Sequence, residues 1–260
     1  MNTAPGDEPV LVDRDEDIVT LTLHNPTRKN AFSAAMRDRL AVLLAELDDD
    51  PQCRAIVLTG HGGEFSAGAD LAGFGETSVR ACRSRLKRGG MPLMRQMLAG
   101  SKPLVAAVEG HAFGAGLALA SACDYLVAAD GASFCCAFTR VGFIPDMALM
   151  HSLPHRVGMA RAKQMIALAE VIPSERAERL GLVDERVKDG ESLAAARGVA
   201  RRFADGPPLA FEMVKSVFAR GLEDMLRAEL DLQPMLWLSE DHLEGKRAFA
   251  ERRKPRFQGR

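Results

Sequence analysis

Two short, uninterrupted apolar runs constrain the fold of this 260-residue chain more than any other feature. CRAIVLTG (residues 53–60) and KPLVAAVEG (residues 102–110) lack the alternation of a half-exposed strand, and each ends in glycine. Such runs are typical of strands that are buried on both faces of a sheet. Because strands of this kind alternate with helical patterns along the chain, the sequence predicts an α/β fold with right-handed crossovers.

The remaining segments fit this alternation. DIVTLTLHN (17–25) alternates apolar and polar residues and predicts a half-buried strand. A helix is expected from Ser33 as N-cap, with an apolar face made of Met36, Leu40, Leu43, Leu44 and Leu47. Residues 75–100 predict helix with interruptions at Gly89–Gly90 and at Pro92, and the chain from about residue 195 predicts helices alone.

Composition and charge exclude several classes of function. The formal net charge of −1 gives no general attraction to nucleic acid or to an acidic membrane surface, so neither is expected as a partner. No apolar run is long enough to cross a bilayer, and the first residues lack the pattern of a signal peptide. We therefore expect a disordered tail over residues 1–9 and a cytoplasmic protein. Five cysteines without CxxC spacing predict reduced, buried thiols.

Small residues follow a buried strand in two places, in FSAGADL (65–71) and in GHAFGAG (110–116). Each stretch is expected to lead into a helix, whose N-terminus leaves backbone N–H groups unpaired. Two such ends at one cleft would offer two donors to a single oxygen, which is the arrangement of an oxyanion hole. The alternative is that the small residues serve close strand–helix packing. The pattern by itself leaves both interpretations open.

Other motifs are absent or incomplete. The glycines of residues 110–116 have neither the spacing of a dinucleotide-binding turn nor the Lys of a phosphate loop. His151 and His155 have the spacing of two metal ligands on one helix, but Pro154 lies between them and no Glu follows His151. No metal site is therefore expected.

Taken together, several segments are similar to the crotonase family, the enoyl-CoA hydratase/isomerase superfamily. The similarity runs from about Val10 to the C-terminus, and its segments are NPTRKNAFS, VLTGHGGEFSAGADL, KPLVAAVEGHAFGAGLALASACD, GFIPD, SERAERLGLVDERV and SEDHLEGKRAFAERRKPRFQGR. The resemblance implies a crotonase (ClpP-like) spiral of repeated ββα units over residues 10–195 and a helical trimerisation region over residues 196–260. It also implies a homotrimer or hexamer, an acyl-CoA thioester substrate, and no permanently bound cofactor, coenzyme A being part of the substrate.

The resemblance also assigns site residues. Ala69 and Ala115 match the positions whose backbone N–H groups hold the thioester oxygen. The positions that match the coenzyme A-binding residues of the family are Ala31, Ala67, Asp70 and Leu71. Phe249 and Lys254 belong to a C-terminal segment that matches the part of the family fold in contact with the coenzyme A of a neighbouring subunit.

The chain departs from the family pattern at its acid–base residues. The two glutamates that hold water in family hydratases are replaced by Ala118 and Phe138, and neither side chain can transfer a proton. Asp146 matches an aspartate that some family isomerases use to move a proton along the acyl chain. An apolar pocket lined by Phe138, Met147 and Met150 would raise its pKa. The alternative role for Asp146 is to cap the next helix.

We therefore expect an enoyl-CoA isomerase that uses Asp146 and the N–H groups of Ala69 and Ala115. A second hypothesis is a hydratase with other acid–base groups, for which His111, Glu64 and Glu109 are candidates. A third is a non-catalytic acyl-CoA-binding protein. The run MALM (147–150) stands where family members with this aspartate usually have smaller residues, so the acyl site is expected to be reshaped.

Overall fold

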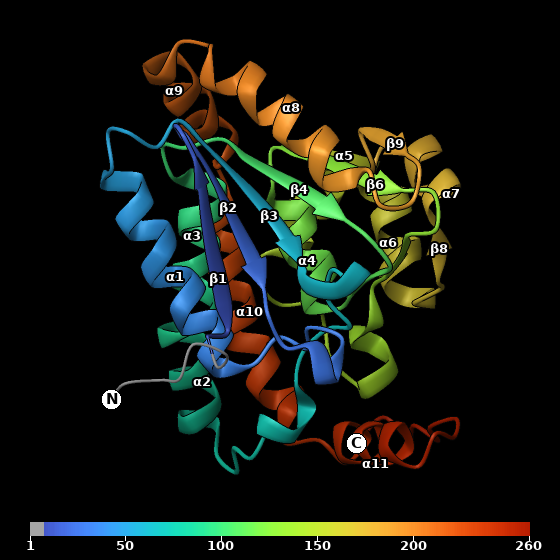
Figure 1. Ribbon diagram of the computed structural model, residues 1–260. Coiled ribbons are helices and arrows are strands. Elements are labelled where there is room, and N and C mark those ends of the chain that lie inside the picture. Colours follow the sequence, from blue (N-terminus) through green and yellow to red (C-terminus); the bar gives the residue numbers. More distant parts are fainter. Residues whose placement is uncertain (1–7) are drawn as a thin grey trace.

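A computed structural model of the chain describes residues 8–260 and confirms the α/β class (Figure 1). The main sheet has the order β1 (Val10–Asp15), β2 (Ile18–Leu23), β3 (Ala55–Gly60), β4 (Leu104–Val108), β6 (Tyr125–Ala129) and β9 (Glu185–Val187). Its strands are parallel except for β1, which pairs antiparallel with β2. A smaller sheet contains β5 (His111–Phe113), β7 (Ser133–Cys135) and β8 (Ile172–Pro173).

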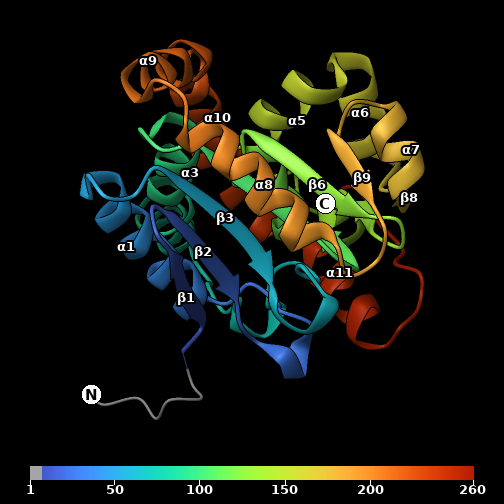
Figure 2. The same cartoon turned by 45° about the horizontal axis from the view of Figure 1, so that its top comes forward.

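Both faces of the main sheet are covered. Helix α8 (Ser192–Ala204) lies across one face (Figure 2), where its Val199 packs with Ala55 and Val57 of β3. The alternate residues Ile56 and Leu58 point to the other face. There they join the larger core with α1 (Ala34–Asp49), α3 (Gly90–Ala99) and α4 (Ala115–Ala122). The apolar runs of β3 and β4 therefore reflect burial on two sides, as predicted.

The other helices are α2 (Val79–Arg88), α5 (Leu149–Val157), α6 (Met159–Leu168), α7 (Ser174–Arg179), α9 (Pro208–Phe218), α10 (Leu222–Trp237) and α11 (Glu240–Ala250). The predicted cap is confirmed, because Ser33 Oγ accepts a hydrogen bond from Met36 N at 3.2 Å. The helical segment before β4 does break at Gly89. The predicted second break at Pro92 is wrong, because Pro92 lies in the first turn of α3, where a missing N–H costs nothing.

Three further expectations need correction. Strand β2 is buried along most of its length rather than half-buried, because its alternate residues enter the cores on both faces of the sheet. The exposed edge is instead β1, which was not predicted. FSAGADL leads into a short 3₁₀ turn, Leu71–Gly73, rather than an α-helix. Helix α8 spans residue 196, the predicted start of a separate helical region, and packs on the sheet.

The predicted thiols are confirmed, since Cys53, Cys82, Cys123, Cys135 and Cys136 are all buried and unbridged. Within residues 8–260, no helix combines the length and apolar character that crossing a membrane requires. Residues 1–7 of the predicted disordered tail lie outside the described residues.

Candidate active site

The two stretches of small residues lie side by side, which is the arrangement that an oxyanion hole requires. Ser66 and Ala112 form a parallel bridge. Ser66 N donates to His111 O at 2.8 Å, and Phe113 N donates to Ser66 O at 3.1 Å. These bonds fix the segment after β3 against the segment after β4.

Each stretch places a glycine with positive φ immediately before an alanine. Gly68 has φ +107° and precedes Ala69, while Gly114 has φ +48° and precedes Ala115. A Cβ on Gly68 would lie 3.0 Å from Phe113 O, so the two backbones approach closely only because the side chain is absent. Neither Ala69 N nor Ala115 N donates to an acceptor in the described part of the chain. Two unpaired backbone donors therefore lie on one wall.

That wall belongs to a cavity of about 320 Å³ between the small-residue loops, α2, α3, α10 and α11. Of the residues assigned by resemblance, the cavity is lined by Ala67, Ala69, Leu71, Ala115, Asp146 and Phe249. Ala31, Asp70 and Lys254 are not part of its described lining. Asp70 instead accepts a hydrogen bond from Arg28 Nη1 at 2.8 Å.

Aromatic side chains form another wall of the cavity. Phe74 stacks on Trp237 with ring centroids 4.8 Å apart, and Phe143 lies 5.2 Å from Trp237. The Arg85 guanidinium covers Phe74, 4.6 Å from the ring centre. Phe138 and Met147 also line the cavity, as expected, whereas Met150 is not among its described lining residues.

Asp146 lines the cavity from the loop before α5. It is half-buried, and its Oδ2 accepts a hydrogen bond from Gln233 Nε2 at 3.3 Å. Burial raises the pKa of Asp146 to about 6, although the Gln233 bond and the charge of Arg85 act in the opposite direction. The helix-cap interpretation of Asp146 is wrong, because α5 has Ala148 at its N-cap and no side-chain cap bond.

The backbone after Asp146 is left-handed for two residues. Met147 and Ala148 both have φ +54°, a conformation that side chains disfavour. The carboxyl of Glu229, on α10, accepts a hydrogen bond from the backbone of Ala148. Glu229 also lines the cavity and is 2% exposed. Its pKa rises to about 9, first because of burial and second because of the charge of Asp146.

Sequence analysis missed Glu229 and Gln233. The signal was available, because both residues fall at helical spacing on the face of α10 that also carries Leu222, Leu226 and Trp237. Polar side chains on an otherwise apolar face have to find partners inside the protein. For Glu229 and Gln233, the partners lie in the loop that carries Asp146.

The alternative acid–base candidates lie elsewhere. Glu64 accepts hydrogen bonds from Lys29 Nζ at 2.7 Å and from the His111 ring at 2.6 Å. These bonds lower the pKa of Glu64 despite its partial burial. Glu109 accepts from the backbone of Gly190 and Ser192 at the start of α8. None of the three candidates belongs to the described cavity lining.

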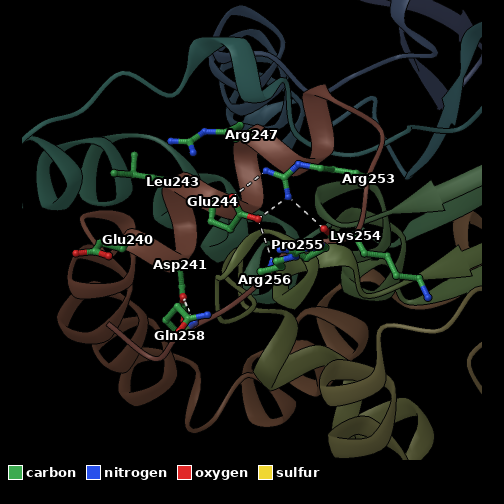
Figure 3. Close-up of a pocket in the computed structure, with 10 residues that line it drawn as sticks. All are labelled: Glu240, Asp241, Leu243, Glu244, Arg247, Arg253, Lys254, Pro255, Arg256 and Gln258. Carbon is green, nitrogen blue, oxygen red and sulfur yellow. Dashed lines mark hydrogen bonds and ion pairs between the residues drawn. The ribbon is translucent and has the colours of Figure 1, made fainter.

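A second hollow, of about 830 Å³, lies between α11 and the C-terminal tail (Figure 3). Glu244 accepts hydrogen bonds from Arg253 and from Arg256 N, which fold the tail back onto the helix. Lys254 lines this hollow, and Figure 3 shows its side chain extending away from α11. Phe249 and Lys254, which were assigned to one coenzyme A contact, therefore lie in different hollows of the chain.

Comparison with known proteins shows to which family the chain belongs. The model of the enoyl-CoA hydratase/isomerase family matches residues 13–260. The chain belongs to the enoyl-CoA hydratase/isomerase family. A probable enoyl-CoA hydratase of Rhodobacter capsulatus is 41% identical over 249 residues, which cover 94% of this chain and 96% of the relative. A 1,2-epoxyphenylacetyl-CoA isomerase of Escherichia coli is 33% identical over 258 residues, which cover 96% of this chain and 98% of the relative.

Solved structures agree with this assignment. An enoyl-CoA hydratase from Mycobacterium avium subsp. paratuberculosis superposes with a TM-score of 0.85 at 30% identity, covering 96% of this chain and 98% of the other. The crotonase fold expected from the sequence is therefore confirmed. Within this enoyl-CoA hydratase/isomerase fold, Ala118 is fully buried in α4 and Phe138 lines the cavity, so neither hydratase position supplies an acid or a base.

Proposed function

We propose that this protein is an isomerase that moves a double bond along the acyl chain of an enoyl-CoA thioester. The observation that carries the proposal is the placement of Asp146. Its carboxyl lines the same cavity as the unpaired N–H groups of Ala69 and Ala115, whereas both hydratase positions are apolar. The name of the Escherichia coli relative, 1,2-epoxyphenylacetyl-CoA isomerase, supports isomerisation of a coenzyme A thioester in general, although its substrate is an epoxide.

The proposed reaction separates removal of a proton from its return. Asp146, ionised above about pH 6, removes the α-proton of a 3-enoyl thioester. The electrons of the broken C–H bond delocalise into a dienolate, whose negative charge falls on the thioester oxygen. The N–H groups of Ala69 and Ala115 act there as an oxyanion hole, worth about 3–4 kcal/mol per donor in comparable enzymes. Return of a proton to the γ-carbon completes the shift to the conjugated 2-enoyl product.

Substrate binding follows from the same cavity. We infer that the aromatic wall of Phe74, Phe143 and Trp237 holds the acyl group. The pantetheine passes the backbone of Ala67 and Leu71, and Phe249 lies at the cavity on α11, where it is 66% exposed. Contacts of coenzyme A with Ala31, Asp70 and Lys254 remain predictions.

Self-association is part of the proposal. Helix α9 leaves an unusual number of large apolar side chains exposed, namely Leu209, Met213, Val214, Val217 and Phe218. An exposed apolar surface of this kind marks an interaction site. It supports the homotrimer or hexamer expected from the resemblance, and analytical ultracentrifugation of the wild type against Phe218→Lys tests it.

The test of the isomerase proposal is an NMR experiment in D2O with 2-enoyl-, 3-enoyl- and dienoyl-CoA thioesters. A double-bond shift with deuterium at the α- or γ-carbon supports isomerisation. Water addition at a comparable rate supports the hydratase alternative. Thioester binding without deuterium uptake from any member of the panel supports a non-catalytic binding protein.

A further inference from the structure

A second carboxyl shares the cavity with Asp146, and the reaction described above leaves it without a role. Glu229 is 2% exposed and lines the cavity. Its Oε1 atom has no hydrogen-bond partner among the described residues. A buried polar atom without a partner is costly, so such groups are few in folded proteins and demand an explanation.

The charges around Glu229 favour its neutral form. Asp146 is the charged group that acts on it, and the effect is repulsive when both are ionised. Helix α2 packs against α10, but Arg83 is directed to Asp231 and to the carbonyl of Leu230. Arg85 is bonded to Glu76 and acts on Asp146 rather than on Glu229. Arg37 and Arg140 also line the cavity, but they are bonded to Asp38 and to the carbonyl of Ala169. No cation is therefore among the described groups that act on Glu229.

The two carboxyls consequently differ in protonation at neutral pH. Asp146 is mostly ionised, while burial and the neighbouring charge keep the pKa of Glu229 at about 9 and the group protonated. Two titratable groups whose surroundings separate their pKa values in this way form an acid and a base in a single site.

We propose that Glu229 is a second catalytic residue, the carboxylic acid that protonates the γ-carbon; this inference rests on the proposed isomerase function. Asp146 takes the α-proton, and the O–H bond of Glu229 breaks as its proton forms the new γ-C–H bond. The dienolate electrons move back from oxygen to form the conjugated double bond. Glu229 is then ionised and Asp146 protonated, and transfer of one proton from Asp146 to Glu229 restores the starting state.

A purely structural role for Glu229 makes a different prediction. Its carboxyl accepts from the backbone of Ala148, which lies in the left-handed turn after Asp146. The amide oxygen of Glu229→Gln can accept the same bond, so this variant retains the support and removes the transferable proton. Glu223→Gln, an identical change at an exposed position of α10, is the matched control.

The experiment follows a 3-enoyl-CoA thioester in D2O by NMR and measures α-deuterium uptake separately from the double-bond shift. We expect Glu229→Gln to keep α-uptake within about threefold of the wild type and to slow the shift by about 100-fold, the usual effect of losing a general acid. Glu223→Gln is expected to match the wild type in both rates. A shift that proceeds at the wild-type rate in Glu229→Gln, or an equal loss of both rates, overturns the proposal.

Two further readouts separate the possible failures. Infrared difference spectra of the wild type against Glu229→Gln are expected to show the carbonyl band of a protonated carboxyl at neutral pH, and absence of that band overturns the proposal even where the variant folds poorly. A wild type that binds the thioester but takes up no deuterium contradicts the isomerase function itself. In that case the proposed catalytic role of Glu229 is contradicted as well. A loss of activity that is confined to Glu229→Gln, while the wild type is active, concerns Glu229 alone.

Discussion

Gln233 Nε2 donates a hydrogen bond to Asp146 Oδ2 across 3.3 Å, and the same nitrogen donates to Ile144 O at 3.1 Å. One amide on α10 therefore holds both the carboxyl and the backbone of the loop that carries it. Because this donor stabilises the charged form of Asp146, it opposes the rise in pKa that burial causes. The relationship ties the position and the basicity of Asp146 to a helix more than 80 residues away in sequence.

Replacing Gln233 by Met tests this relationship. The variant keeps the length of the side chain but removes the donor, so the pKa of Asp146 is expected to rise further above 6. The base must be ionised, so the acidic limb of the kcat profile should move to higher pH, with the largest loss of rate below neutral pH. The pH profile of the double-bond shift measures this. Gln164→Met, the same change at an exposed position of α6, should leave the limb in place.

Glu229 makes the stability of the protein depend on pH in a defined direction. Its pKa is raised in the folded state, so the folded protein binds the proton more tightly than the unfolded chain, and stability falls as pH rises. The window runs from the unfolded pKa of about 4.3 to the folded value near 9, with a slope of about 1.4 kcal/mol per pH unit.

Urea unfolding at several pH values compares Glu229→Gln with the wild type. Since glutamine does not titrate, the variant should gain stability relative to the wild type as pH rises through this window. Glu223→Gln should keep a constant difference from the wild type above the ordinary carboxyl pKa, because Arg95 lowers the pKa of Glu223. A difference between Glu229→Gln and the wild type that stays flat from acid to alkaline pH contradicts the raised pKa.

The glycine before Ala69 is expected to be essential. Gly68→Ala places a side chain at φ +107° and a Cβ 3.0 Å from Phe113 O. Strain of this kind costs about 1–3 kcal/mol, and any relaxation separates Ala69 N from Ala115 N. We expect a lower thermal midpoint and a fall in kcat. Gly198→Ala, at an open position in the interior of α8, should instead stabilise the protein by about 0.5–1 kcal/mol.

Much of the fold could be predicted from the sequence because the relevant signals are local. The apolar runs of β3 and β4, the cap at Ser33 and the break at Gly89 each depend on residues that are close along the chain. Strand β1 was missed because its residues are mostly exposed and charged, and it is a strand only through its pairing with β2. Edge strands carry little apolar signal of their own.

The residues of the site likewise differ in whether local sequence signals could predict them. Ala69, Ala115 and Asp146 belong to motifs that can be recognised within a few residues, and the structure places them on one cavity. Glu229 and Gln233 reach that cavity from α10, so their role depends on a tertiary contact that no local motif records. Phe249 and Lys254 likewise lie in different hollows because the C-terminal tail folds back on α11, where Glu244 accepts a hydrogen bond from Arg253.

The measurement that tests the central claim most directly compares the wild type with Asp146→Asn in D2O, using a 3-enoyl-CoA thioester and NMR detection. The substitution preserves shape and removes the base. We predict that the wild type takes up deuterium and shifts the double bond, and that the variant binds the thioester but loses both activities by at least about 100-fold. An Asp146→Asn protein that shifts the double bond at the wild-type rate, or a wild type that adds water without any shift, would contradict the account.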